Sequence, residues 1–214
     1  MNIAFLTAVL LKSHVAIETR TLFEDLGGGK RGGHLMFERI VSDKGFTLIT
    51  KTISPEGDVT FGTQEFTLQG VPVSSSQEGS WNERWNVFET AYGTGGTVQT
   101  INGEVTKSKH GAKQFVNPTV LWFWQTHPKV GTSVTVDFLA QNTIATFKIK
   151  FTYEGDDKMK VQGREVVLHR VHERPLSARD GVYTVWWYDD NGMGVKRYHK
   201  TTEHEFRAEL ASWR

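Results

Sequence analysis

Apolar and polar residues alternate along most of the chain from His14 onward, and this alternation is the dominant pattern of the sequence. Val134, Val136 and Phe138 alternate with polar neighbours, and the same period of two runs through residues 147–153. A period of two places successive side chains on opposite faces of a strand, so each segment has one apolar and one polar face. The pattern therefore predicts antiparallel strands that are half-buried against a core.

Short runs of turn-forming residues separate these segments and predict hairpins. Asn102-Gly103 is the strongest signal, because a two-residue hairpin turn needs positive φ at both central positions. The other expected turns and loops contain Gly, Asp, Asn or Ser; they are Gly27–Gly33, Asp43–Gly45, Pro55–Asp58, Ser74–Gly79, Glu154–Asp157 and Asp189–Gly192. The segments between these turns predict about 9–12 strands.

The segment from Trp81 to Tyr92 fits two secondary structures. Its aromatic residues follow the three- and four-residue spacing of a helical stripe, whereas Trp85, Val87 and Glu89 fit the alternation of a strand. Strands are predicted on both sides of the segment, so we expect a strand here as well.

Val116 to His127 is the most apolar and aromatic run, and it is the one segment after residue 14 for which we predict a helix. Asn117 is a good N-cap, and Pro118 suits the first helical position, where its missing N–H costs nothing. Pro128 disfavours the helical conformation at the residue before it and so ends the run. We expect a short helix near residues 117–126 that acts as a plug.

No Pro- or Ser-rich linker divides the chain, which predicts one β-rich domain over residues 1–214. The expected fold class is all-β: a strongly curved antiparallel sheet, or open half-barrel, that closes on the plug helix. The apolar run Ile3–Leu11 is too short to span a membrane and lacks a basic residue before it. We interpret it as an ordered first helix or strand, with a degenerate signal peptide as the alternative.

Composition narrows the classes of function. The chain has 25 Lys+Arg against 24 Asp+Glu, a formal charge of +1, and so has no field that would attract nucleic acid or an anionic membrane. A hydrophobic content of 38% fits a domain of alternating strands. The absence of cysteine excludes disulfides, thiolate metal sites and a cysteine nucleophile. No G-x-S-x-G motif is present, so a serine hydrolase is not expected.

Aromatic side chains are the candidate ligand-binding residues. Trp122, Phe123 and Trp124 of the plug could line a pocket together with Trp186 and Trp187, because aromatic walls with a few polar groups are typical of apolar ligand sites. The alternative is that these rings pack in the core. Helical spacing places Phe123 and Trp124 on the same face as Val120 and turns Trp122 away from it.

The last predicted hairpin adds a cation to these rings. If Asn191-Gly192 forms the tip, Trp186 lies opposite Arg197, and Trp187 lies opposite Lys196. A tryptophan facing an arginine is suited to a cation–π contact. Arg197 could then hold a ligand carboxylate. The alternative is that both pairs are surface cross-strand contacts.

Titratable residues suggest little further chemistry. The eight histidines include no H-x-H or H-E-x-x-H spacing, so neither a metal site nor a cofactor is expected. Asp137 and Glu173 lie in or at the end of predicted strands. A carboxylate beside tryptophans on a concave face would have a raised pKa and could act as an acid. Alternation places Asp137 on the polar face of its strand, which favours solvent exposure for that residue.

Three stretches together resemble a family of bacterial β-rich proteins of unknown function, related in fold to the LolA-like lipoprotein carriers. The stretches are T-R-T-L-F-E-D-L-G-G-G-K-R-G-G-H-L-M-F-E-R (19–39), N-P-T-V-L-W-F-W with H-P-K-V-G-T-S-V-T-V-D-F (117–124 and 127–138), and V-Q-G-R-E-V with Y-T-V-W-W-Y-D-D-N-G-M-G-V-K-R-Y (161–166 and 183–198). The resemblance implies an open antiparallel barrel whose concave face holds an apolar molecule. This chain departs from the family in its tryptophan-rich plug and in the lack of a convincing signal peptide.

We expect non-catalytic binding of a small hydrophobic or amphipathic molecule, or a lipid, in the aromatic concave face. The alternative is a lipocalin-like enzyme, a cyclase, isomerase or hydratase, that uses a carboxylate or histidine as proton donor. A third class is a structural or envelope-assembly protein that pairs through an exposed sheet edge. No nucleic-acid partner is expected, and the oligomeric state stays open. The expected location is cytoplasmic, and the resemblance implies a periplasmic or exported location as the alternative.

Overall fold

The computed structural model describes residues 14–25, 30–54, 56–81, 83–112, 128–139, 146–190, 192–202 and 204–213. These residues form 14 strands and contain no α-helix. The strands are β1 (His14–Asp25), β2 (Lys30–Val41), β3 (Gly45–Ile53), β4 (Val59–Thr67), β5 (Pro72–Trp81), β6 (Arg84–Tyr92), β7 (Thr97–Ile101), β8 (Glu104–Ser108), β9 (Ser133–Leu139), β10 (Thr146–Val161), β11 (Arg164–Pro175), β12 (Tyr183–Tyr188), β13 (Gly194–Lys200) and β14 (His204–Trp213). The predicted all-β fold class is confirmed, and the strands are more numerous than expected.

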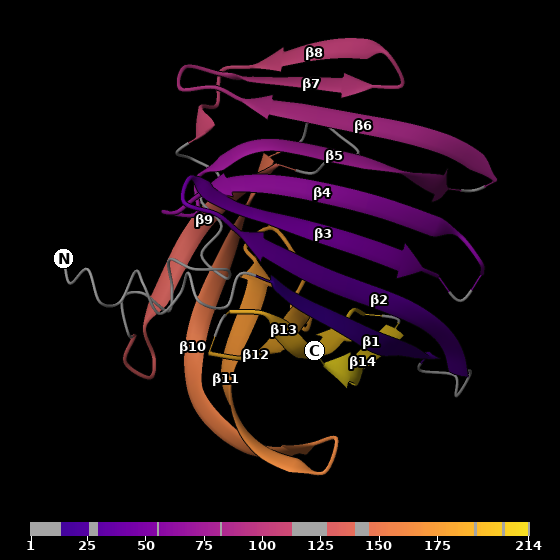
Figure 1. Cartoon of the computed structure of the whole chain (residues 1–214), viewed down its shortest axis with the longest axis vertical. Helices are drawn as coiled ribbons and strands as arrows, with labels where there is room; N and C mark the ends of the chain where they lie inside the picture. Colours follow the sequence, from indigo (N-terminus) through magenta and orange to yellow (C-terminus); the bar gives the residue numbers. More distant parts are fainter. Residues whose placement is uncertain are drawn as a thin grey trace.

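The strands form one antiparallel sheet in the order β8-β7-β6-β5-β4-β3-β2-β1-β14-β13-β12-β11-β10-β9. Strands that follow one another in sequence are neighbours, except β8 and β9, and a ladder between β1 and β14 joins the first strand to the last. Because β8 and β9 lie at opposite ends of this order, the sheet is not closed into a barrel. In Figure 1, β2–β8 form one layer, and the long strands β10 and β11 run across the direction of β3–β6 and curl at their far end.

One face of the sheet is buried on most strands, and the register allows it to be followed from strand to strand, because residues directly opposite one another share a face. On β2, for example, Arg39 and Val41 are buried, whereas Ile40 between them is 41% exposed. We call this buried face the inner face. Its buried residues are Leu35, Arg39, Val41, Phe46, Leu48, Phe66, Ser75, Phe88, Thr90, Thr97, Gln99, Ile149, Phe151, Tyr153, Val171, Thr184 and Tyr188.

Two apolar clusters hold the curved sheet together. The first joins Phe46 and Phe66 of β3 and β4, whose rings stack at 4.8 Å, to residues from the other half of the sheet. Those residues are Leu168 of β11 and Met193 and Val195 at the start of β13. The second cluster lies within β10–β12 and contains Ile149, Phe151, Tyr153, Val171 and Tyr188. The first cluster therefore fixes how strongly the sheet folds over on itself.

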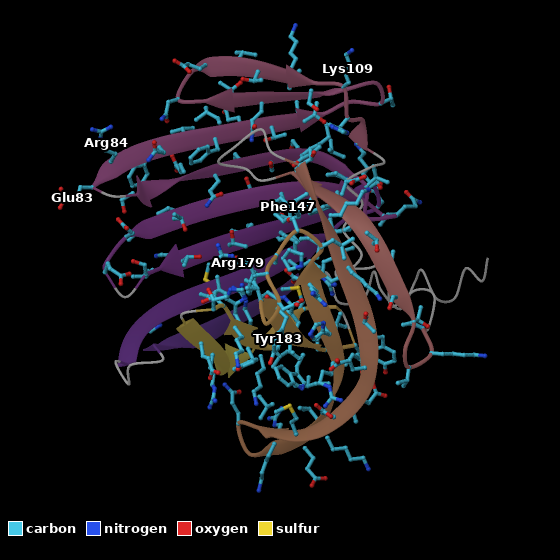
Figure 2. The ribbon with its side chains drawn as sticks, turned by 180° about the vertical axis from the view of Figure 1, so that it is seen from behind. Glu83, Arg84, Lys109, Phe147, Arg179 and Tyr183 are labelled. Carbon is cyan, nitrogen blue, oxygen red and sulfur yellow. The ribbon has the colours of Figure 1, made fainter. Side chains whose placement is uncertain are left out.

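The hairpin turn between β7 and β8 confirms the signal that predicted it. Asn102 and Gly103 both have positive φ, at 50° and 90°, and connect β7 to β8. The segment from Trp81 to Tyr92 forms the end of β5, a turn and β6, so the strand interpretation was correct. Glu83 and Arg84 project from that turn at the end of the sheet (Figure 2).

Three expected turns or loops are strands instead. Ser74–Gly79 lies within β5, in the middle of the sheet, because its backbone pairs with β4 on one side and β6 on the other. Glu154–Asp157 is not a turn: β10 continues through it with a bulge at Gly155. Lys30–Gly33, expected in a loop, pairs with β1 as the start of β2.

The plug helix expected near residues 117–126 lies outside the described residues, as does the run Ile3–Leu11. Both stay predictions. Within the described ranges, no helix is long and apolar enough to span a membrane.

Candidate functional site

The candidate site lies on the inner face, where β11, β12 and β13 are neighbours. Alternation along β12 places Thr184, Trp186 and Tyr188 on that face. The register then puts Glu173 and His199 on either side of Thr184, and it puts Arg197 beside Trp186. We call Glu173, Thr184, Trp186, Arg197 and His199 the inner-face cluster. It combines a carboxylate, a hydroxyl, an indole, a guanidinium and an imidazole on three adjacent strands.

Trp186 connects the two charged members of the cluster. Its indole Nε1–H donates a hydrogen bond to Glu173 Oε2 at 2.8 Å. The guanidinium carbon of Arg197 lies 4.9 Å from the centre of the indole ring, which is cation–π geometry. The Trp186 indole thus shields Glu173 from water at its N–H edge and Arg197 at its ring face.

Burial shifts the pKa values of Glu173 and Arg197 in the directions that favour their neutral forms. Burial raises the pKa of Glu173, and the hydrogen bond from Trp186 and the charge of Arg197 oppose this increase. Burial likewise lowers the pKa of Arg197, and the charges of Glu173 and Tyr188 oppose the decrease. Removing one member of such a buried pair leaves the other charge uncompensated, which is strongly destabilising.

Thr184 and His199 form the polar pair of the cluster. Thr184 is 2% exposed, and its Oγ1 lies 2.8 Å from His199 Nδ1. Burial and the nearby charge of Arg197 lower the pKa of His199 to about 4, and a hydrogen bond with the Tyr183 backbone partly opposes this shift. His199 is therefore neutral at physiological pH. A neutral imidazole can accept a proton, so the cluster holds a base on β13 and, on the far side of Thr184, a carboxyl group on β11 whose pKa is raised.

Aromatic residues from both halves of the sheet fix the Trp186 ring. Tyr188, two residues further along β12, stacks on it at 5.8 Å between ring centres. Phe37 of β2 meets it edge-on at 6.2 Å and an interplanar angle of 69°. Gly194 lies under the ring, so close that a Cβ there would be 2.9 Å from Trp186 Cζ3. The indole is consequently held from three sides.

The predicted cross-strand pairs are confirmed: Trp186 lies opposite Arg197, and Trp187 lies opposite Lys196. The two tryptophans face opposite sides of β12. Trp187 donates a hydrogen bond from Nε1 to Asp157 Oδ2 at 2.7 Å, and Lys196 lies 4.9 Å from the centre of its ring. Trp186 and Arg197 are both half-buried, and the Nε atom of Arg197 is buried.

The structure separates the two candidate carboxylates. Asp137 forms an ion pair with Lys148 at 2.9 Å on the outer face, as alternation predicted, whereas Glu173 belongs to the inner-face cluster. Thr184 and His199 were not among the site residues predicted from the sequence. The signal for both was available, because the same hairpin register that pairs Trp186 with Arg197 also pairs Thr184 with His199.

The structure does not test the plug aromatics and shows no metal-binding group among the described residues. Trp122, Phe123 and Trp124 lie outside the described residues, so their proximity to Trp186 stays a prediction. In the described part of the chain, no group of three or more His, Asp or Glu residues is arranged to hold a metal ion.

No family model matches the chain, and no curated protein matches it. Among solved structures, it is similar to a β-barrel-like protein of the domain-of-unknown-function family DUF1849 from Brucella abortus, with a TM-score of 0.68, 10% identity, and coverage of 94% of this chain and 97% of that one. At this identity, the likeness shows the fold alone.

Two other solved bacterial proteins are similar over most of their length. One is the hypothetical lipoprotein YmcC from Escherichia coli K12, with a TM-score of 0.40, 12% identity, and coverage of 92% of this chain and 84% of that one. The other is a DUF1329 family protein from Desulfovibrio piger, with a TM-score of 0.22, 9% identity, and coverage of 99% of this chain and 89% of that one. Of the three, the Brucella abortus structure agrees with the expected β-rich fold, and it does not single out the LolA-like carriers.

Proposed function

We propose that this protein binds a small amphipathic molecule on the inner face of its curved sheet, with the acidic headgroup of the ligand at Arg197 and no catalytic step. One observation carries the proposal: the half-buried Arg197 guanidinium on the inner face is stacked on Trp186, with its Nε atom buried. Such a group binds carboxylates well, because its charge and its fork of N–H donors match the two oxygens. The resemblance to LolA-like carriers supports the same class of ligand.

The chemistry of the inner face supports an amphipathic ligand over a purely apolar one. The buried side chains of the part formed by β2–β4 and β10 are aliphatic and aromatic apart from Arg39, as Leu48, Phe66 and Ile149 illustrate. The part formed by β6 and β7 buries polar side chains instead, among them Thr90, Thr97 and Gln99. A molecule with an apolar chain and a polar end matches this division of the face.

Binding is tested by native mass spectrometry of freshly purified protein, followed by titration with palmitate and with 1-hexadecanol as the uncharged counterpart. We expect a retained lipid-like mass and a higher affinity for palmitate. Arg197→Lys should weaken palmitate binding by roughly tenfold, the scale of one hydrogen bond to a charged group, because lysine cannot provide the planar fork. The affinity for hexadecanol should change little.

Arg207→Gln is the matched control, because Arg207 is an exposed arginine that packs on the Tyr198 ring at 5.7 Å, away from the cluster. It should bind palmitate like the unmodified protein. A clean unliganded mass, together with no palmitate binding at micromolar concentrations, would contradict the proposal. Circular dichroism of each variant separates a loss of the site from a loss of the fold.

The second candidate function is a lipocalin-like enzyme, and one observation favours it. The environment of the inner-face cluster raises the pKa of Glu173 and lowers the pKa of His199, and a pair of titratable groups shifted apart in this way is typical of acid–base sites. Such an enzyme would move a proton within a bound isomerisable ligand. Incubation of candidate unsaturated ligands in D₂O should then incorporate deuterium, and Glu173→Gln should abolish the incorporation while retaining binding.

Two further predictions concern self-association and location. Pairing through an exposed sheet edge would give concentration-dependent association in light scattering, which neither binding nor catalysis requires. The cytoplasmic location stays a prediction, with the exported location as its alternative.

A further inference from the structure

His169 of β11 connects two carboxylates that come from different parts of the chain. Its Nδ1 lies 2.7 Å from Asp156 Oδ1 of β10, and its Nε2 lies 2.9 Å from Asp190 Oδ1 in the turn between β12 and β13. The His169 side chain is 19% exposed, whereas those of Asp156 and Asp190 are 50% and 86% exposed. The histidine thus fills the space between one strand and one turn.

The geometry requires a specific protonation state. An imidazole donates from both ring nitrogens only when it carries a positive charge, and a neutral imidazole has a lone pair on one of them. With a carboxylate at hydrogen-bond distance from each nitrogen, loss of the proton leaves one carboxylate facing that lone pair. Both contacts therefore persist together only in the imidazolium form. Imidazole is also the side chain whose charge ordinarily changes between pH 5 and 8.

The turn that Asp190 belongs to also contacts the other half of the sheet. Its neighbour Asp189 is 3% exposed, accepts a hydrogen bond from the Met193 backbone N–H at 2.8 Å, and interacts electrostatically with the buried Arg39 of β2. Met193 packs in the cluster that contains Phe46. Adjacent aspartates in one turn thus reach β11 on one side and β2 on the other.

We propose that His169 is a pH-sensitive tie, which as an imidazolium holds the β12–β13 turn to β10 and β11 and on losing its proton releases the Asp190 side of that turn. The tie is closed while the histidine is charged and both carboxylates are ionised. It opens when the imidazole is neutral, because one ring nitrogen then presents a lone pair to a carboxylate.

The other groups that face His169 keep their charge states over this range. Tyr153 of β10 lies with its ring centre 6.4 Å from that of His169, and its hydroxyl donates a hydrogen bond to Asp156. Burial and the contact with Asp156 raise the pKa of Tyr153 to about 12. Burial acts to raise the pKa of Asp156, but hydrogen bonds from Tyr153 and His169 outweigh it and the pKa is lowered. Tyr188 of β12 is the register neighbour of His169 on the other side.

The tie is tested on the full chain by hydrogen–deuterium exchange of the peptide that contains Met193, at pH 5.5 and pH 7.5, corrected for the intrinsic pH dependence of exchange. We expect the corrected rate to rise by roughly fivefold at the higher pH, the upper end of what an exposed ion pair contributes. Asp190→Asn should remove this dependence and keep the turn protected at both pH values, because an asparagine amide can donate to the neutral imidazole. His169→Gln should also remove it, with the turn less protected at both.

His172→Gln is the matched control, since His172 lies on the same strand but stacks on Tyr183 at 5.0 Å on the opposite face. It should retain the pH dependence of the unmodified protein. Equal protection of the turn at both pH values in the unmodified protein would overturn the proposal. So would a pH dependence that persists in both Asp190→Asn and His169→Gln. These outcomes are independent of whether palmitate binds.

Discussion

Gly194 shows how one residue without a side chain keeps the candidate site in place. The Trp186 ring lies across it, and a Cβ at this position would be 2.9 Å and 3.0 Å from two carbons of the indole. A flat ring that covers a strand glycine excludes water from the backbone and at the same time loses rotational freedom. Glycine is therefore needed at position 194 because the Trp186 ring leaves no room for a side chain, and not because of the backbone conformation there.

Gly194→Ala should lower the free energy of unfolding by about 1–3 kcal/mol, the typical cost of overpacking. It should also tilt the indole and break the hydrogen bond between Trp186 and Glu173. Urea denaturation measures the first effect, and the indole N–H resonance reports the second. Gly32→Ala is the control, because a Cβ at Gly32 meets no atom within 4 Å. Equal stability of the two variants would contradict the proposed packing.

His199 provides a second test at the scale of a residue. Its pKa is lowered to about 4 by burial and by the charge of Arg197, whereas a free imidazole titrates near 6.5. The unfolded chain therefore binds a proton more readily than the folded protein between these values. The stability linked to His199 is complete above about pH 6.5 and falls as the pH decreases towards about 4.

In NMR titration of ring-labelled protein, the His199 resonances should stay constant between pH 5 and 8. His199→Gln identifies the signal by its disappearance, and the same substitution should make the protein less sensitive to acid in urea denaturation. A titration of this signal with a midpoint near 6.5 would show that the imidazole is solvated and that the inner-face cluster is not closed.

At the scale of elements, the bulge in β10 determines which side chains meet. The register shifts between Tyr153 and Gly155, and Gly155 adopts a φ of 117°. Because the extra residue reverses the alternation, Tyr153 and Asp156 lie on the same side of the strand although they are three residues apart. This is what allows both to contact each other beside His169.

Gly155→Ala should destabilise the protein by about 1–3 kcal/mol, the cost of a strained backbone conformation. The cause is the backbone alone, since the nearest atom to a Cβ there is a Val130 carbon at an ordinary 3.5 Å. Thermal denaturation measures the effect, with Gly32→Ala again as control. A stability unchanged by Gly155→Ala would mean that the bulge relaxes, and the exchange of the Met193 peptide should then also be unchanged.

Strands also differ in how well the sequence alone predicts them. The β7–β8 and β12–β13 hairpins could be predicted because their turn residues fix the register locally. β5 could not, because its run of serines, Ser74 to Ser76, has little intrinsic preference for a strand. Its side chains are satisfied by neighbouring strands instead, through Ser76 with Thr63 at 2.6 Å and Ser74 with Glu65 at 2.6 Å. Tertiary pairing overrides propensity there.

At the scale of the whole molecule, the two halves of the sheet are held together by the cluster around Leu168. This residue is 0% exposed and packs in a cluster with Phe46 and Phe66 from the far half. A core shared in this way makes the halves unfold together. The curvature of the sheet is then a consequence of burying this cluster as much as of strand twist.

Leu168→Ala should lower the free energy of unfolding by about 2–5 kcal/mol, as expected for a truncated core leucine. Val167→Ala, one residue earlier and 46% exposed, should change it by about 0.5 kcal/mol or less. Urea denaturation followed by circular dichroism and by tryptophan fluorescence should give coincident single transitions. Separate transitions in the Leu168→Ala protein would show that each half has its own independent core.

The sequence by itself determined the all-β class, most of the hairpins and the pairing of Trp186 with Arg197, because alternation and turn chemistry act over a few residues. The tertiary structure decided what depends on distant segments. It joined β1 to β14, selected the inner face, and buried Arg197 beside Glu173. It also placed Asp190 against His169, 21 residues away in sequence. Such choices follow from packing distant segments against one another, and a local pattern cannot state which face of a strand is then buried.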